Sequence, residues 1–212
     1  NRVYLEEEMS RLAKSREFAD LILKLSKHNV LSVLVGIVST VLVQSSSAVI
    51  AVVQNLASQA SPDGVTSVLK LGTAIPILLG SNIGTTITAL LASIGGRINA
   101  KRAAVAHLVF NGIGAFLMLF FIPSFTKIVQ FLSPKGDELS VISRQIANSH
   151  TLFNVLNTVV WFPFIWFLSK LVMTLIKGED EIVEHRILYL DNRMLGNPAI
   201  AMNLATRELA RM

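Results

Sequence analysis

The chain has 212 residues, of which 52% are hydrophobic and 16% are charged. Soluble domains usually carry about 25% charged residues, and the mean hydropathy of +0.57 points the same way. The formal net charge is +5, but no stripe of Lys and Arg interleaved with aromatic residues indicates a nucleic-acid partner. The absence of cysteine excludes disulfides and thiolate metal sites. Composition therefore predicts a protein embedded in a lipid bilayer.

Residues 1–28 are predicted to form an amphipathic arm helix. Apolar side chains recur there at helical spacing, from Leu5 to Leu25, with Lys and Arg between them. Such a helix lies in the membrane interface or packs on protein, and the pattern leaves both open. The chain begins with Asn rather than Met, which we interpret as the start of a fragment of something longer.

The next segment, 30–57, is apolar on both sides of a polar cluster, Gln44-Ser45-Ser46-Ser47. Polar groups at bilayer depth are costly unless protein, water or a ligand satisfies them. The flanks of about 14 and about 10 residues are each too short to span, since a spanning helix needs about 20 residues. The segment is either one broken helix or, the reading we favour, a re-entrant hairpin with the cluster at its tip.

Residues 65–94 repeat this pattern, and we expect a broken transmembrane helix there. An apolar half runs to Leu79, a polar stretch with two glycines covers 80–86, and a second apolar half follows. Pro76 and the glycines weaken helical hydrogen bonding or stiffness in the middle of the span. Such a break is tolerated at membrane depth where the backbone is buried in protein or lines a cavity.

The remaining chain is predicted to contain two further spans and a charged tail. The spans cover 103–122 and roughly 146–176, with a kink at Pro163. Basic residues cluster before the first span and flank the second, so the positive-inside rule places both clusters on the cytoplasmic side. We thus expect one transmembrane unit over 29–177, followed by a cytoplasmic extension over 178–212.

Two discontinuous segments with polar breaks at similar depth are typical of a secondary-transporter binding site. Helix N-termini at a break suit an anion, and unwound carbonyls suit a small cation such as sodium. No Lys or Arg lies in 30–69 or in 71–96. An anion bound here would therefore be held by helix dipoles, hydroxyls and co-bound cations.

A second pattern is the repeated H-x-x-F-N of His107–Asn111 and His150–Asn154. Each places a His and an Asn on one helix face. The pair is either a proton or substrate relay or, more commonly in membrane bundles, a set of interhelical hydrogen-bonding contacts. A metal site would need further ligands, and the apolar spans contain no Asp or Glu.

These residues resemble the type II sodium-dependent phosphate cotransporters, in particular the bacterial members. The resemblance rests on Q-S-S-S at 44–47, L-G-S-N-I-G-T-T at 79–86, A-H-L-V-F-N at 106–111 and I-A-N-S-H-T-L-F-N at 146–154. The stretch 189–198 is similar to the start of a PhoU-like helical domain fused to many of them. That family has two inverted repeats, each with a Q-S-S-S motif, whereas this chain carries the motif once.

The resemblance implies which residues hold the solutes. The phosphate ligands would be Gln44, Ser45, Ser46, Ser47, Asn82 and Thr85. The sodium ligands would be Ser47, Ser81, Asn82, Gly84, Thr85 and Thr86. The residues expected to support the site from around it are His107, Asn111, His150 and Asn154. No other metal and no organic cofactor is expected.

The resulting hypothesis is an all-α membrane protein forming one inverted-repeat half of an elevator-type transporter. It would import inorganic phosphate with sodium across the inner membrane, with the other repeat cut away, on a separate chain, or supplied by a second copy. Two alternatives are a non-transporting scaffold or regulator that acts through its tail, and an intramembrane serine hydrolase. The hydrolase is disfavoured because the chain has no G-x-S-x-G and nothing in it orients a histidine toward a serine.

Overall fold

The computed structural model describes residues 22–24, 28–178 and 196–211. It divides into two compact units, 1–178 and 179–212. The described helix of the second unit is α10 (Pro198–Arg211). Most of the predicted arm helix over 1–28 lies outside the described residues.

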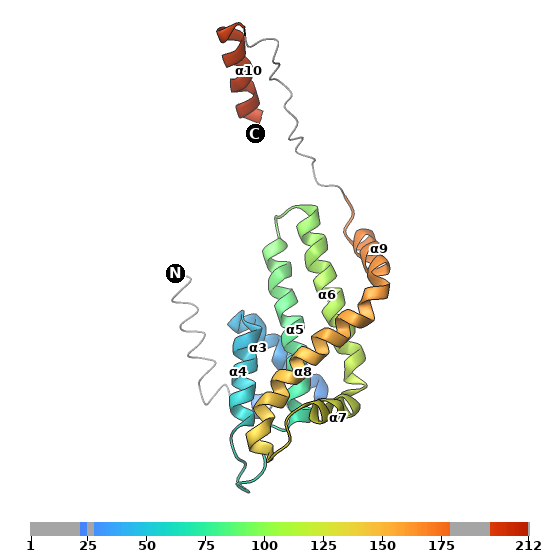
Figure 1. The fold of residues 1–212 in the computed structure, drawn as a ribbon. Coiled ribbons are helices and arrows are strands. Elements are labelled where there is room, and N and C mark those ends of the chain that lie inside the picture. Colours follow the sequence, from blue (N-terminus) through green and yellow to red (C-terminus); the bar gives the residue numbers. More distant parts are fainter. Residues whose placement is uncertain (1–21, 25–27, 179–195, 212) are drawn as a thin grey trace. The chain divides into compact units, whose positions relative to one another are not determined.

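The described part of the first unit is built from helices, as the all-α prediction required (Figure 1). They are α3 (Asn29–Val43), α4 (Ser46–Ala57), α5 (Leu71–Ser93), α6 (Ile98–Leu119), α7 (Ile122–Leu132), α8 (Glu138–Trp161) and α9 (Ile165–Leu175). A 3-10 turn over Phe162–Phe164 separates α8 from α9. The predicted interruption at Pro163 is therefore confirmed.

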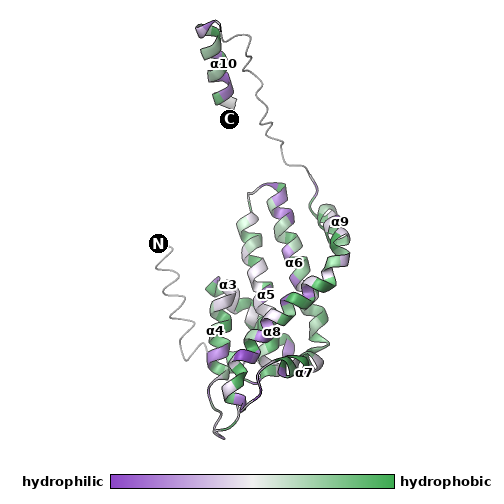
Figure 2. Cartoon of the chain, in the orientation of Figure 1, coloured by the Kyte–Doolittle hydropathy of each residue, from purple (hydrophilic) through white to green (hydrophobic). Residues whose placement is uncertain are grey.

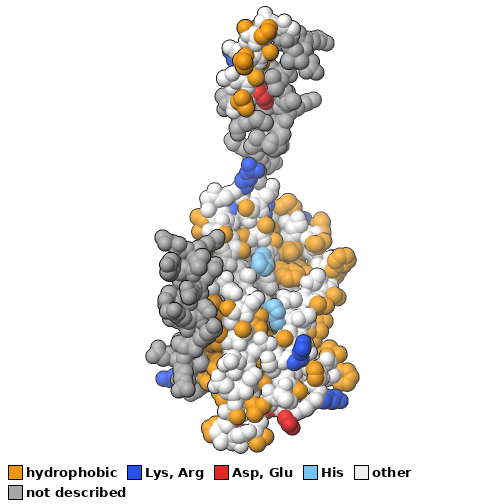
Figure 3. All heavy atoms as spheres, turned by 60° about the vertical axis from the view of Figure 1, so that its left-hand side comes forward, with side chains coloured by type: hydrophobic (Ala, Val, Ile, Leu, Met, Phe, Trp, Pro, Cys, Tyr) orange, Lys and Arg blue, Asp and Glu red, His pale blue; other side chains and the backbone are white. Residues whose placement is uncertain are grey.

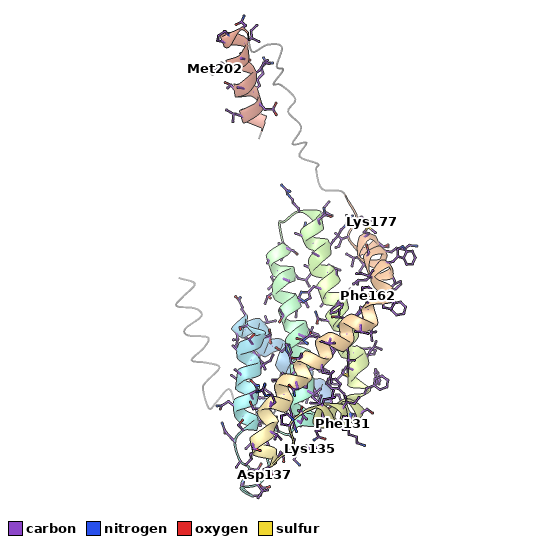
Figure 4. The ribbon with its side chains drawn as sticks, in the orientation of Figure 1. Phe131, Lys135, Asp137, Phe162, Lys177 and Met202 are labelled. Atoms are coloured by element: carbon purple, nitrogen blue, oxygen red, sulfur yellow. The ribbon has the colours of Figure 1, made fainter. Side chains whose placement is uncertain are left out.

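Three stretches are long and apolar enough to cross a membrane, namely α5, α6 and the combined run Glu138–Leu175. Figure 2 shows hydrophobic colour along α9 and mixed colour on α10. Lys135 and Asp137 lie in the turn at one end of the unit, Lys177 lies at the opposite end, and Phe162 projects from the side between them (Figure 4). Phe162 is 76% exposed, which suits a side chain that faces lipid rather than water.

The segment 30–57 forms a helical hairpin. Gly36 of α3 faces Ile77 of α5 and Gly84 of α5 faces Thr40 of α3, so the two helices run in the same direction. The end of α4 lies beside the start of α5, because the Ser67 hydroxyl lies within hydrogen-bonding distance of both Ala57 O and Leu69 O. Consequently α4 runs back against α3, and the two short helices meet at Gln44.

The second predicted break does not exist, because α5 is one continuous helix through Pro76 and the whole stretch 80–86. Its glycines serve close packing instead of unwinding. A Cβ on Gly80 would overlap the carbonyl oxygen of Val33, and one on Gly84 would lie 2.8 Å from Ile37 O. Small residues that let helix backbones approach are the common packing device in membranes. The prediction of a break at 80–86 is therefore wrong.

At the end of the unit opposite the 58–70 connection, Arg102 joins the start of α6 to the end of α9. Its Nε donates to Ile176 O at 3.1 Å and its Nη2 donates to Gly178 O at 2.7 Å. This contact places the basic α5–α6 connection and Lys177 at one end of the unit. Both predicted basic clusters thus lie on the same side.

Candidate functional site

The tip of the hairpin is a sharp backbone break made by Gln44 and Ser45. Gln44 adopts φ 53°, a left-handed conformation, and ends α3 by donating its N–H to Thr40 O at 2.7 Å. Ser45 is extended and begins α4, where its Oγ accepts from the Ala48 N–H at 3.3 Å. The first N–H groups of a helix have no partner within it. The amides of Ser46 and Ser47 are such groups, so the tip offers donors and a positive dipole end.

The side chains of the tip are accessible. Gln44 and Ser47 are exposed and Ser45 and Ser46 are half-buried. Among the described residues, the side chains of Gln44, Ser46 and Ser47 make no hydrogen bond. These three predicted anion ligands are therefore without a side-chain partner in the protein.

A buried hydrogen bond joins the hairpin to α5, one helical turn before the hairpin tip. The Thr40 hydroxyl donates to the Ser81 Oγ at 2.8 Å, and both side chains are buried. Sequence reasoning included Ser81 but missed Thr40. The available signal was its spacing, because Thr40 precedes Gln44 by one helical turn and so shares its face.

The helix α8 contributes the second half of the site through His150. Its Nε2 lies 3.1 Å from Asn82 Oδ1 and 3.3 Å from Asn154 Nδ2. Asn154 Nδ2 also donates to the carbonyl oxygen of His150 at 2.9 Å. The second H-x-x-F-N motif thus reaches the G-S-N-I-G-T-T motif directly.

The hairpin tip and this polar cluster lie at the same level. Gln54 of α4 donates to Ser143 O of α8 at 2.9 Å. The helix α8 runs in the direction of α5, since its residue 143 meets the end of α4 and its residue 150 meets Asn82, so α4 and α8 are antiparallel. Ser47 and His150 are each seven residues, about 10 Å of helix, beyond that contact.

One polar atom of the cluster lacks a partner. Asn82 is 8% exposed, and its Nδ2 is a buried atom without a hydrogen bond. Leaving a buried donor unsatisfied costs about 1–3 kcal/mol. A ligand that accepts from Asn82 would remove that cost.

Other predicted site residues have their donors committed to their own helix. The Thr85 hydroxyl donates to Ser81 O at 3.0 Å and the Thr86 hydroxyl donates to Ile83 O at 2.7 Å. Their oxygens remain available only as acceptors, which suits a cation. Gly84 packs against Thr40.

The first H-x-x-F-N motif is arranged differently from the second. Asn111 is buried and donates to the carbonyl oxygen of His107 at 3.1 Å, whereas the His107 side chain is exposed. Only the α8 motif reaches the polar cluster. Its histidine contacts asparagines rather than a serine, which gives the hydrolase alternative no support.

The hairpin and α5 bring no formally charged side chain to the site, whereas α8 brings the titratable His150. The elements α3, α4 and α5 contain no Asp, Glu, Lys, Arg or His. Within the described residues, no group of three or more His, Cys, Asp or Glu is placed to hold a metal ion. Figure 3 shows hydrophobic side chains scattered over one face of the unit, with few charged ones. The first unit is therefore that of a helical membrane protein with an uncharged polar site between a hairpin and two longer helices.

Comparison with known proteins names the family. Residues 3–133 match the family model described as Na+/Pi-cotransporter. The chain belongs to this Na+/Pi-cotransporter family.

Three relatives illustrate the range of the family. The uncharacterized protein YqeW of Bacillus subtilis is 33% identical over 168 residues, 79% of this chain and 50% of that protein. The putative inorganic phosphate export protein YjbB of Salmonella typhimurium is 25% identical over 146 residues, 68% of this chain and 26% of that protein. The sodium-dependent phosphate transport protein 2A of Oryctolagus cuniculus is 35% identical over 96 residues, 42% of this chain and 14% of that protein. No solved structure matches. The chain therefore spans half or less of these relatives' lengths.

Proposed function

We propose that this chain is part of a sodium-coupled transporter that imports inorganic phosphate across the cytoplasmic membrane. The observation that carries the proposal is the uncharged hairpin tip of Gln44 to Ser47, level with the unpartnered Asn82 amide. Family membership supports phosphate as the solute. Import is proposed because a downhill sodium gradient directed into the cell would drive symport inward, although one relative is named an export protein.

We assign each group to phosphate or to sodium by whether it donates or accepts hydrogen bonds. Free amides of Ser46 and Ser47, with the side chains of Gln44, Ser45, Ser46 and Asn82, would donate to phosphate oxygens. The oxygens of Ser47, Ser81, Thr85 and Thr86, with the backbone of Gly84, would hold sodium. Sodium bound there would supply the positive charge that the site lacks, and this would couple the two solutes.

The movement proposed for the transport step is a rigid-body displacement of the hairpin with α5 against the other helices. The close backbone packing of α3 on α5 supports treating these two as one body. In this proposal the chain is one of two inverted repeats. The other repeat belongs to a longer form of the protein, to a separate chain, or to a second copy.

The test is uptake of radiolabelled phosphate into vesicles, with and without an inward sodium gradient, using the full-length protein. Ser46→Ala and Asn82→Ala should reduce sodium-driven uptake about tenfold or more, because each removes a hydrogen bond to a charged ligand. Ser169→Ala, on exposed α9, is the matched control and should behave as wild type. Near-normal uptake by both site variants at equal expression would refute the site.

A further inference from the structure

The ring nitrogen Nε2 of His150 lies near two asparagines, one of which requires a hydrogen-bond donor and the other an acceptor. Asn82 Oδ1, at 3.1 Å, is an acceptor and requires Nε2 to carry a hydrogen. Asn154 Nδ2, at 3.3 Å, is a donor and requires Nε2 to offer a lone pair. One nitrogen cannot satisfy both at once.

The hydrogen bonds of Asn154 indicate whether Nε2 carries the hydrogen. Its Nδ2 already donates to the carbonyl oxygen of His150 at the shorter distance of 2.9 Å. A hydrogen on Nε2 therefore gives one bond to Asn82 and leaves the Asn154 bond intact. The opposite arrangement would set a lone pair against Asn82 Oδ1.

The hydrogen bond from His150 determines which end of the Asn82 amide is free. With Oδ1 held by the imidazole, the NH2 group of Asn82 is the end that has no partner. An NH2 group offers donors and no acceptor, so it suits an oxyanion and repels a cation.

We propose that His150 is a positioning residue that holds Oδ1 of Asn82 and so presents the Asn82 NH2 group to the phosphate. This assigns Asn82 to the anion rather than to sodium. The assignment rests on the proposed function, which it deepens. It gives the uncharged site a buried side-chain donor at the level of the α4 amides.

The experiment compares three substitutions of the full-length protein with wild type. His150→Leu removes the donor, and His150→Gln replaces it with a side-chain NH2 that can still donate to Oδ1. Asn82→Asp keeps the shape of the side chain but replaces the free donor with an acceptor. His28→Leu, at an exposed histidine just before α3, is the matched control. Thermal unfolding of each purified variant reports whether it is folded.

The readouts are the phosphate concentration for half-maximal uptake at saturating sodium, and the sodium concentration for half-maximal uptake at saturating phosphate. We expect His150→Leu to raise the phosphate concentration for half-maximal uptake about tenfold or more, because the Asn82 NH2 group is no longer held toward the charged ligand. The sodium concentration for half-maximal uptake should change less than about threefold. His150→Gln should restore phosphate affinity to within about threefold of wild type, and Asn82→Asp should abolish it. His28→Leu should match wild type.

Unchanged phosphate affinity in His150→Leu, no rescue by Gln, or a shift confined to sodium would each overturn the inference. Binding of inorganic phosphate to the purified protein is measured separately. A wild type that binds phosphate without sodium-driven uptake would contradict the proposed function, and the same variants would then be compared by binding. A wild type that binds no phosphate would overturn both.

Discussion

At the scale of single residues, three glycines set the distance between α3 and α5. Gly36 and Gly80 each face a carbonyl oxygen of the opposite helix, and Gly84 faces the side chain of Thr40. An added Cβ at the first two positions would overlap backbone, which cannot rotate away as a side chain can. The close approach also brings Thr40 within hydrogen-bonding distance of Ser81. Glycine is thus required here for packing rather than for backbone flexibility.

The first prediction tests this packing. Gly80→Ala should lower the stability of the unit by about 1–3 kcal/mol, because overpacking forces the helices apart. Gly72→Ala is the control, since a Cβ there meets nothing within 4 Å. It should leave stability unchanged or raise it by up to about 1 kcal/mol through helix propensity. Thermal unfolding in detergent measures both, and equal midpoints for the two variants would contradict the role of Gly80.

At the scale of elements, the hairpin stores strain at its tip. Gln44 adopts φ 53° although it is not a glycine, a conformation that costs a non-glycine residue roughly 1–2 kcal/mol. Natural proteins keep such strain where function needs a particular side chain. The hairpin is therefore a place where stability and function should trade against each other.

A second prediction follows for Gln44→Gly. Glycine adopts positive φ without steric cost, so the variant should be as stable as wild type or more stable by up to about 1 kcal/mol. It removes the amide proposed to contact phosphate, so sodium-driven uptake should fall. Thermal unfolding and vesicle uptake are measured on the same preparation. Gln59→Gly, in the exposed loop after α4, serves as the control for loss of a glutamine, and full uptake by Gln44→Gly would exclude its side chain from the site.

At the scale of the whole unit, the positions of the charged residues indicate which end faces the cytoplasm. Lys135 and Asp137 lie at one end and Lys177 at the other (Figure 4). The Arg102 contacts with Ile176 and Gly178 join the basic α5–α6 connection to the Lys177 end. The positive-inside rule then places the Lys177 end in the cytoplasm, which remains our proposal for the orientation.

The third prediction tests this orientation, and the chain offers a clean background because it has no cysteine. Lys135→Cys should react with a membrane-impermeant maleimide in intact cells. Lys177→Cys should react only after the membrane is opened. The unsubstituted chain, which should not react, is the control. The reverse labelling pattern would invert the topology, and equal labelling of both positions in intact cells would contradict a single orientation.

The helices and their interruptions were easier to predict from the sequence than the contacts between helices. The break at Gln44, the interruption at Pro163 and the helical character of the spans were all predicted and confirmed. The break at 80–86 was wrong, since glycine is compatible with both unwinding and close helix packing, and only the neighbouring helix distinguishes them. Thr40 was missed for a related reason, because its partner Ser81 is 41 residues away in the chain.

The amino-acid sequence by itself determined that this is a helical membrane protein of apolar spans with one polar, uncharged tip, because hydropathy and local backbone preference act over a few residues. Only the tertiary structure decided which polar residues meet. His107 and His150 occur in the same motif, yet only His150 contacts Asn82. The physical reason is that a side-chain hydrogen bond depends on how helices pack, and packing depends on surfaces far apart in the chain.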